Sequence, residues 1–455
     1  MNAILNIFKS VATTPALLVG LIAFLGLVLQ KKPATNVIQG SIKTFAGFLI
    51  LTGGSTILSN ALTPFAKMFK FALGVQGVVP SNEAVVAIAL VKYGSTAALI
   101  MLVGMIVNVL LARFTKFKYI FLTGQAMLYV ACFAAVVMVS AGMGSGWKTI
   151  LLGGLFEGTL FTVTPALCQP FMRRITKADT VAMGHTGNIG YAIAGWCGKL
   201  FGDKSHDTED INFPKSLGFM RDSTVSITLV MSIVYIILAI VCGPHFVESK
   251  LSAGTNFIVY AIVQAGTFAA GFAVVLQGVR MILAEIIPAF QGIAQKLVPN
   301  SKPALDVPII FPYAPNAVLL GFVVSFIVGT ICMFIMIAMH TTVIIPGVVG
   351  HFFCGAAAAI YGNSMGGRRG AIIGASVNGI IISFLPLFVL PVLGSLKMAA
   401  STFADTDYLI PGIILGKLGS AGATALTIGI IAFTVIVILI SLFMKSPKQA
   451  TKQSK

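Results

Sequence analysis

Side chains that could do chemistry gather in one segment of this sequence, residues 278–318. The segment holds the acids Glu285 and Asp306 with one arginine, two lysines and six prolines, and long apolar runs flank it on both sides. Proline removes a backbone donor and interrupts regular helix. A carboxylate in such a break between apolar helices is a candidate ligand-binding group. We therefore expect Asp306 either to form the floor of a binding site or to cap the next helix.

Further polar candidates stand in two other apolar stretches. His185 lies in the glycine-rich stretch AMGHTGNIGYA beside Thr186, and glycine lets the backbone approach a ligand closely. A contact to a ligand and a structural hydrogen bond both remain open for His185. Gln125 and Tyr129 are four residues apart and so share one helix face. That pair suits recognition of hydroxyl groups, but it would equally join two helices.

Several chemistries lack support in the sequence. No nucleophile triad connects the polar residues, and no GxxxxGK[ST] motif for binding ATP occurs. The six cysteines are scattered singly, without a CxxC pair or the spacing of a zinc site. We therefore predict no catalytic residue, no metal ligand and no cofactor.

The composition is that of a membrane protein. Hydrophobic residues make up 57% of the chain and charged residues 9%, against about 25% charged in soluble domains. Runs such as 13–30 and 423–444 are long enough to cross ~30 Å of hydrocarbon as helices. The first run lacks a small-residue cleavage site and is therefore taken as a span. We predict an all-α polytopic membrane protein with about 10–11 transmembrane helices, and two amphipathic interfacial helices at 61–74 and 288–299.

The net charge of +17 lies in short clusters between the apolar runs, as at Lys31-Lys32 and Arg368-Arg369. This is the positive-inside pattern of membrane proteins rather than a nucleic-acid surface. The tail after Met444 contains lysines and no acid. The C-terminus is therefore expected in the cytoplasm.

The two halves of the chain resemble each other. Residues 50–65 align with 275–290 at an offset of 225, and residues 142–158 align with 363–379 at an offset of 221. We predict repeats at approximately 38–168 and 262–395, with the polar loop 202–223 between the halves; chance similarity of glycine-rich segments is the alternative. Repeats of this kind are typical of secondary transporters, whose substrate site lies where the repeats meet. The 225 offset places Ser81, followed by Asn82 and Glu83, opposite Asp306.

The sequence QGVRMILAEIIPAFQGIAQKLVPNSKPALD (277–306), followed by FPYAPNAVLLGF (311–322), resembles the ascorbate-type IIC components of the bacterial phosphotransferase system. LTG at 122–124, MGH at 183–185 and IIPG at 344–347 occur in the matching order. The resemblance implies a homodimer in the bacterial cell membrane with a dimerisation domain. It also implies a core (transport) domain of two inverted structural repeats that carries its sugar by an elevator-like motion. Such a subunit is not itself an enzyme: a separate cytoplasmic IIB protein, charged by IIA and HPr, phosphorylates the sugar. No fused IIA or IIB domain is expected.

The resemblance also implies which residues contact the substrate. They are Asn82, Glu83, Gln125, Tyr129, His185, Thr186 and Asp306. The family pattern has His at 125, Gln at 129 and 186, and Thr-Tyr at 82–83, so five positions depart from it. Glu83 would repel the ascorbate anion, and HTG at 185–187 also resembles the galactitol-type relatives. L-ascorbate or a related sugar is the expected substrate. A galactitol- or pentitol-type permease and an ion-coupled secondary transporter of a small polar solute are the alternatives.

Overall fold

The computed structural model describes residues 14–211, 223–396 and 401–444, and these residues form mostly helices joined by short strands and turns. Within them the strands are only two to four residues long. The elements follow in the order α2 (Pro15–Leu29), α3 (Ala34–Leu73), β1 (Gly77–Pro80), α4 (Asn82–Phe114), β2 (Tyr119–Phe121), α5 (Gly124–Ser140), α6 (Trp147–Thr176), β3 (Ala182–Met183), α7 (Asn188–Phe201), η1 (Thr208–Asp210), α8 (Ser223–Cys242), α9 (Pro244–Lys250), α10 (Phe257–Leu297), β4 (Lys302–Leu305), η3 (Val307–Tyr313), α11 (Pro315–Ala338), β5 (Val343–Ile344), α12 (Val348–Phe384), α13 (Pro386–Val389), η4 (Leu390–Leu396), β6 (Ser401–Thr402), α14 (Thr406–Ser420) and α15 (Ala423–Phe443).

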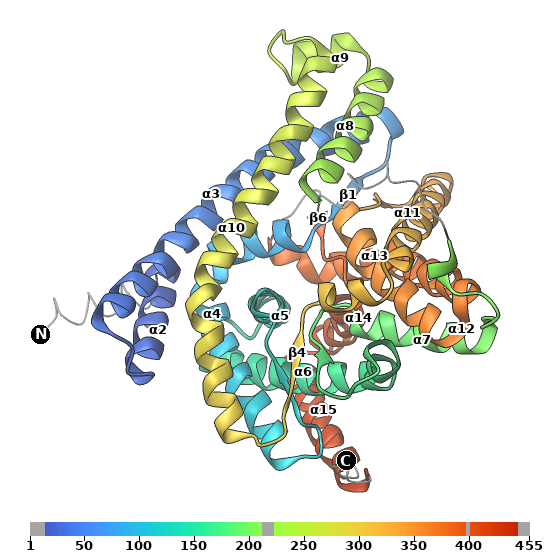
Figure 1. The fold of residues 1–455 in the computed structure, drawn as a ribbon. Coiled ribbons are helices and arrows are strands. Elements are labelled where there is room, and N and C mark those ends of the chain that lie inside the picture. Colours follow the sequence, from blue (N-terminus) through green and yellow to red (C-terminus); the bar gives the residue numbers. More distant parts are fainter. Residues whose placement is uncertain (1–13, 212–222, 397–400, 445–455) are drawn as a thin grey trace, which may run out of the picture.

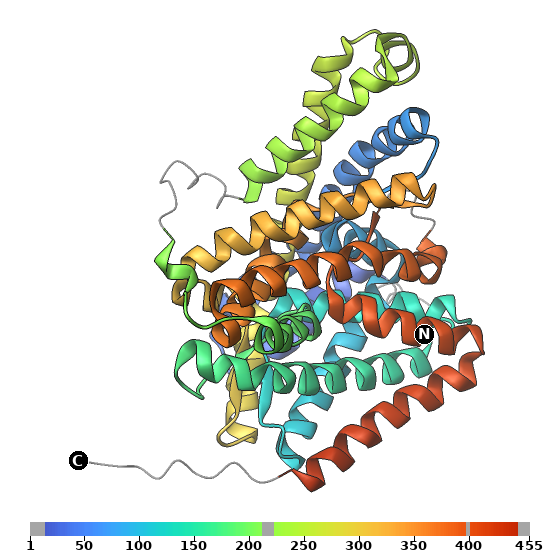
Figure 2. The same ribbon diagram turned by 90° about the vertical axis from the view of Figure 1, so that its right-hand side faces the viewer.

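Helices α2, α3, α8, α9 and α10 form an arm along one side of the molecule (Figure 1). The long helices α3 and α10 lie side by side because glycines remove side chains from their contact. A Cβ on Gly54 would come within 2.7 Å of the backbone nitrogen of Val275, and one on Gly278 within 2.5 Å of that of Leu51. Between 227–242 and α9 the chain bends by 103°, and this end of the arm projects away from the other helices (Figure 2).

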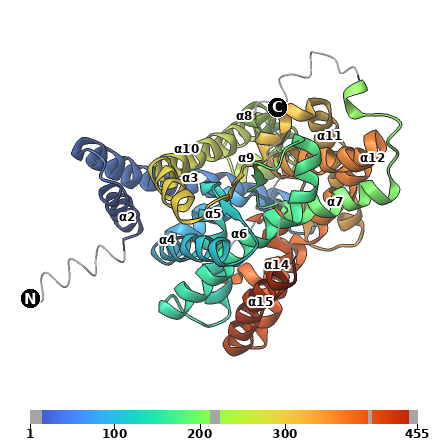
Figure 3. The same ribbon diagram turned by 60° about the horizontal axis from the view of Figure 1, so that its bottom comes forward.

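Helices α4–α7, α11, α12 and α14 pack into a core beside the arm, and α14 lies next to α15 (Figure 3). Helix α12 is two limbs joined by a sharp break at Gly366 and Gly367. Gly367 has φ +57°, a conformation that glycine adopts readily. The limbs return antiparallel, so that a Cβ on Gly374 would lie 2.8 Å from the Ala358 carbonyl oxygen. Small residues thus allow the hairpin to close.

Two three-stranded parallel sheets lie at the centre of the fold, in the orders β5-β1-β6 and β2-β4-β3. The central strand of each sheet comes from one half of the chain and its two neighbours from the other half. β1 pairs with β5 and β6, whereas β4 pairs with β2 and β3. Because each central strand pairs only with strands from the other half of the chain, the two sheets hold the two halves together.

The class predicted from the sequence, an all-α polytopic membrane protein, is confirmed. Among the described residues, seven helices have the length and hydropathy of a membrane span, or eight if the bent α8–α9 pair counts as one. This is fewer than the ten or eleven predicted. The apolar run 118–141 divides into β2 and the 17-residue α5, and α2 is only 15 residues long. The two antiparallel limbs of α12 and the segment that follows them, Val348–Gly394, enter this number as one stretch, although the chain turns back at Gly366 and Gly367.

Helix α4 contains a kink at Tyr93, which has non-helical φ and ψ. The separate amphipathic helices at 61–74 and 288–299 are wrong. Helix α3 continues through Pro64 to Leu73, and α10 continues to Leu297, because each stretch extends a helix that is already paired along its length. Of the predicted loop 202–223, residues 212–222 lie outside the described residues, as does the tail after Met444.

Candidate functional site

The carboxyl ends of the six strands converge at the centre of the core, and a helix starts shortly after each strand. Parallel strands end at the same edge of a sheet, so the residues that follow them collect in one place. Asn82 follows β1, Thr123 follows β2 and His185 follows β3. Asp306 directly follows β4, and Asp405 follows β6. These connections supply most of the polar side chains of one cavity.

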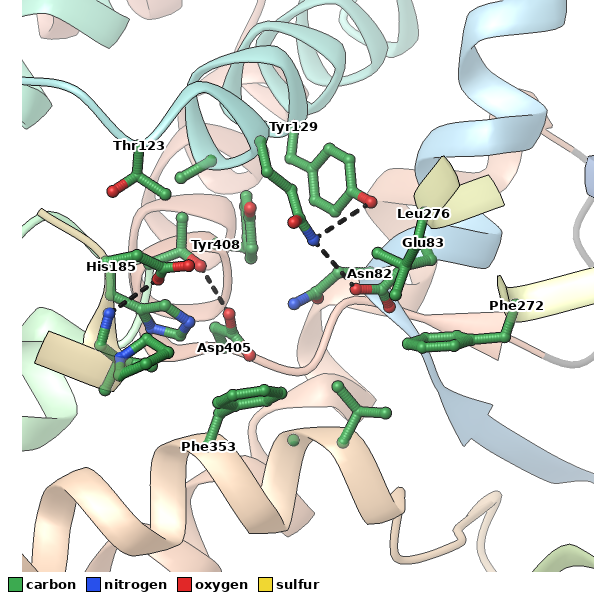
Figure 4. A pocket seen from close by; sticks show the side chains of 18 of the residues that line it. Asn82, Glu83, Thr123, Tyr129, His185, Phe272, Leu276, Phe353, Asp405 and Tyr408 are labelled. Atoms are coloured by element: carbon green, nitrogen blue, oxygen red, sulfur yellow. Dashed lines mark hydrogen bonds between the residues drawn. The ribbon is translucent and has the colours of Figure 1, made fainter. Parts of the chain in front are cut away.

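This cavity has a volume of about 230 Å³. All seven residues predicted as substrate contacts line it: Asn82, Glu83, Gln125, Tyr129, His185, Thr186 and Asp306. The rest of the lining consists of Thr123, Ala126, Phe272, Leu276, Arg280, Val307, Pro308, Val349, Gly350, Phe353, Asp405 and Tyr408. Polar groups from both halves of the chain therefore surround one space, closed on one side by aromatic and aliphatic side chains (Figure 4).

One wall of the cavity is a hydrogen-bonded group at the starts of α4 and α5. The Gln125 side-chain amide donates to Glu83 Oε1 and to the Tyr129 hydroxyl, each at 3.4 Å. Gln125 and Tyr129 thus share a helix face as predicted. Glu83 is only 5% exposed and also accepts a hydrogen bond from Ser81 at 3.4 Å. Asn82 Oδ1 accepts the backbone N–H of Ala404 at 2.8 Å, which joins this wall to the opposite half.

The opposite wall is built around Asp405, which is 3% exposed. The Thr186 hydroxyl donates to Asp405 Oδ2 at 2.5 Å, and the Cys354 thiol donates to Oδ1 at 3.4 Å. The backbone N–H of Asp407 donates to the Thr186 carbonyl at 2.8 Å. These bonds fix the start of α14 against the connection between β3 and α7, and hold the side chains around the cavity in place.

Asp306 caps the helix that follows it, as one of the two predictions stated, and it also lines the cavity. Its side chain accepts the backbone N–H of Val307 at 2.8 Å, as the N-cap of η3. Ser81, which lies 225 residues earlier, caps α4 by accepting from the N–H of Ala84 at 3.2 Å. The two central strands are therefore each followed by a capped helix at the cavity edge.

Two charged lining residues were not predicted as site residues. Arg280 lines the cavity from α10. Asp405 was missed altogether. Strand β6 begins 219 residues after β3. Carrying that offset from Thr186 leads to Asp405, but the sequence similarity noted at offsets of 225 and 221 does not extend to this part of the chain.

His185, Cys354 and Asp405 form the one group of three possible metal ligands found among the described residues, with their ligand atoms within 4.8 Å of one another. These atoms already have partners. His185 Nδ1 contacts the Tyr191 hydroxyl at 2.7 Å and accepts the N–H of Gly187 at 3.1 Å, and the thiol is bonded to the carboxylate. The group is thus a hydrogen-bond network beside the cavity, and its geometry is explained without a metal.

A charged cluster lies outside the cavity, around Asp179 in the connection between α6 and β3. Asp179 Oδ1 accepts from Arg173 at 2.9 Å, from Lys302 at 2.6 Å and from Gln169 at 2.8 Å. Partial burial alone would raise the pKa of this carboxyl, but the three donors outweigh it and lower the pKa from 3.8 to about 2. The cluster joins the end of α6 to the start of β4.

Comparison with known proteins defines the class of this membrane protein. The chain belongs to the PTS system sugar-specific permease component family, whose model matches residues 10–407. It is 26% identical over 426 residues to the ascorbate-specific PTS system EIIC component of Mycoplasma pneumoniae. The match covers 81% of this chain and 64% of that relative, so the chain spans a little less than two thirds of the relative's length. The family assignment agrees with the resemblance seen in the sequence.

Proposed function

We propose that this chain is the IIC permease of a phosphoenolpyruvate-dependent phosphotransferase system. It binds L-ascorbate or a related sugar in the central cavity and moves it across the membrane. On the cytoplasmic side, a separate phospho-IIB protein phosphorylates the sugar. The observation that carries the proposal is the cavity itself. Carboxylate, amide, hydroxyl and imidazole groups converge on a space of about 230 Å³ inside an apolar helical protein. A sugar with several hydroxyl groups would satisfy these donors and acceptors, which are otherwise costly to bury.

A galactitol- or pentitol-type substrate is the second candidate, and the charges of the cavity favour it. Glu83, Asp306 and Asp405 line the space, and Arg280 is the one Lys or Arg in the described lining. An anion such as ascorbate would be repelled by the carboxylates, and the repulsion is stronger where water is excluded. An uncharged polyol would donate its hydroxyl protons to them. The name of the mycoplasma relative favours ascorbate instead.

The cavity lies between the arm and the core, and this position supports an elevator-like transport cycle. Phe272, Leu276 and Arg280 are spaced four residues apart and line the cavity from one face of α10 in the arm. Most of the other lining residues belong to the core or to its strand connections. We propose that the core moves along the arm, that the arm contributes the dimer contact, and that the halves are inverted repeats. The reciprocal pairing of β1 and β4 supports the repeats.

The cytoplasmic side is proposed to be the face that carries Arg113, Lys116, Lys118 and Arg173. Basic loops prefer the cytoplasm. The Lys116 ammonium group donates to the carbonyl oxygens of Leu442 and Met444 at the end of α15. The C-terminus of this span therefore lies on the same side as the basic face. In a bacterial cell membrane, this side would meet IIB.

The test is sugar uptake by membrane vesicles that contain the chain, with and without phosphorylated IIB inside. The proposal predicts accumulation of sugar phosphate only when phospho-IIB is present. Uptake of unmodified sugar that follows a proton gradient, unchanged without IIB, would instead show an ion-coupled carrier. A vesicle without the chain is the control for leakage.

A further inference from the structure

A buried tyrosine behind the cavity contacts the ring of His185. Tyr191 on α7 is fully buried, and its ring stacks on the His185 ring with centroids 5.7 Å apart and planes at 22°. Its hydroxyl lies 2.7 Å from His185 Nδ1. A Cβ on Gly187 would collide with this hydroxyl, so the glycine leaves the space that the tyrosine occupies. The ring contact and the hydrogen bond together fix the plane of the imidazole.

The hydrogen bonds around His185 also determine which ring nitrogen carries the proton. A backbone N–H can only donate, and the N–H of Gly187 points at Nδ1 from 3.1 Å. Nδ1 of the neutral imidazole is therefore an acceptor, and the proton lies on Nε2. The Tyr191 hydroxyl has one proton and lies 2.7 Å from this Nδ1 and 3.6 Å from the Cys354 sulfur. We assign the proton to the shorter contact, so that the hydroxyl donates to Nδ1. Because His185 lines the cavity, the Nε2–H group is the polar edge that remains for a ligand.

We propose that the Tyr191 hydroxyl is a positioning group that holds His185 as the Nε2–H tautomer, with this N–H donating to an oxygen atom of the sugar. The inference rests on the proposed function, since it concerns recognition in the same cavity. Under this proposal, the site offers the sugar both hydrogen-bond acceptors and a hydrogen-bond donor. Glu83, Asp306 and Asp405 offer acceptors for sugar hydroxyl protons, whereas His185 offers a fixed donor on the wall that carries Asp405.

A double-mutant cycle between residues 191 and 185 separates positioning from a general structural role. Tyr191→Phe keeps the packed ring and removes the hydroxyl, so sugar affinity should fall about 3- to 10-fold, the effect of one hydrogen bond. In a His185→Gln background, without an imidazole to orient, the same change should have little effect. An equal loss in both backgrounds would overturn the proposal. Tyr235→Phe is the matched control, because this buried tyrosine donates at 2.6 Å to the Ala61 carbonyl within the arm.

Two substitutions of His185 test which nitrogen the sugar meets. The amide of Gln reaches the position of Nε2, whereas the amide of Asn reaches only that of Nδ1. His185→Gln should therefore retain more affinity than His185→Asn, by about 10-fold for one hydrogen bond. The reverse order would contradict the proposed donor.

A readout independent of sugar keeps the inference separate from the proposed function. The chain has five histidines, so ¹⁵N-histidine labelling gives few signals, and the signal lost in His185→Gln belongs to His185. We expect Nδ1 without a proton and Nε2 with one, and a protonated Nδ1 in the neutral ring would overturn the inference. Failure of the wild-type chain to bind any sugar would count against the proposed function instead.

Discussion

Replacing Asp405 by asparagine should weaken sugar binding while leaving the fold intact. The substitution keeps the size of the side chain and removes its charge. Asp405 stands at the N-cap position of α14, but its side chain makes no capping hydrogen bond. The helix therefore loses no capping bond when the carboxylate becomes an amide. What changes are the hydrogen bonds from Thr186 at 2.5 Å and from Cys354 at 3.4 Å, and the carboxylate that faces the cavity.

The magnitude follows from the kind of hydrogen bond. Bonds to charged groups contribute about 1.5–3 kcal/mol and neutral ones about 0.5–1.5 kcal/mol. Asp405→Asn should thus lose about 1–1.5 kcal/mol, which is about a 5- to 10-fold weaker affinity. Asp405→Ala removes every acceptor that this side chain offers to the sugar, and the loss of binding free energy should rise to about 1.5–3 kcal/mol, or up to about 100-fold in affinity.

The assay is equilibrium binding of radiolabelled sugar to the purified chain in detergent, with size exclusion and thermal unfolding to verify the fold. Asp203→Asn is the matched control, since Asp203 is exposed and the hydrogen bonds described for its side chain go to Ser205. Equal affinity of the Asp405 and Asp203 variants would refute the role of Asp405. A graded loss from Asn to Ala, with Asp203→Asn at the wild-type level, is the expected result.

Two further predictions concern stability. Gly104→Ala should destabilise the chain by about 1–3 kcal/mol through overpacking, because its Cβ would lie 2.6 Å from Oε2 of the buried Glu157. Thermal unfolding should show this loss as a lower transition temperature. Gly146→Ala is the control and should leave the transition unchanged, because no atom lies within 4 Å of its added Cβ. Asp179→Asn should lower the unfolding temperature at neutral pH but not near pH 2. The folded pKa of Asp179 is about 2 and its usual value is 3.8, so its contribution to stability is present above about pH 4 and is lost as the pH falls towards 2. A difference between the Asp179 variant and the wild type that is independent of pH would contradict this explanation.

Hydropathy predicts most of the helices because each span must satisfy its own backbone within hydrocarbon. In the sequence, apolar runs at 341–361 and 370–395 correspond broadly to the two limbs of α12 and its continuation. The strands were beyond prediction, since two to four residues are too few to show a period of two. The sequence also did not predict that residues 61–74 and 288–299 continue the long helices α3 and α10. Sequence periodicity does not reveal that a helix continues along a neighbouring helix.

The site was predictable where the internal similarity applied. Offset 225 led from Asp306 to Ser81 and its neighbours, and the cavity joins Asn82, Glu83 and Asp306. Asp405 was missed because it lies beyond the aligned segments 142–158 and 363–379, where no match to the first half was noted. Arg280 could not be recognised, because only the packing of α10 against the core decides which of its faces borders the cavity. Sequence distance alone carries no such information.

The most direct test of the central claim is saturable binding of L-ascorbate, galactitol and pentitols to the purified chain and to Asp306→Ser. Serine can keep the cap that Asp306 provides to η3, as Ser81 does for α4, and it removes the carboxylate from the cavity. The account predicts that at least one of these sugars binds the wild-type chain. It also predicts that Asp306→Ser weakens this binding about 10-fold or more, as expected for a charge-assisted hydrogen bond. Absence of saturable binding, or equal affinity of the folded variant, would contradict the account.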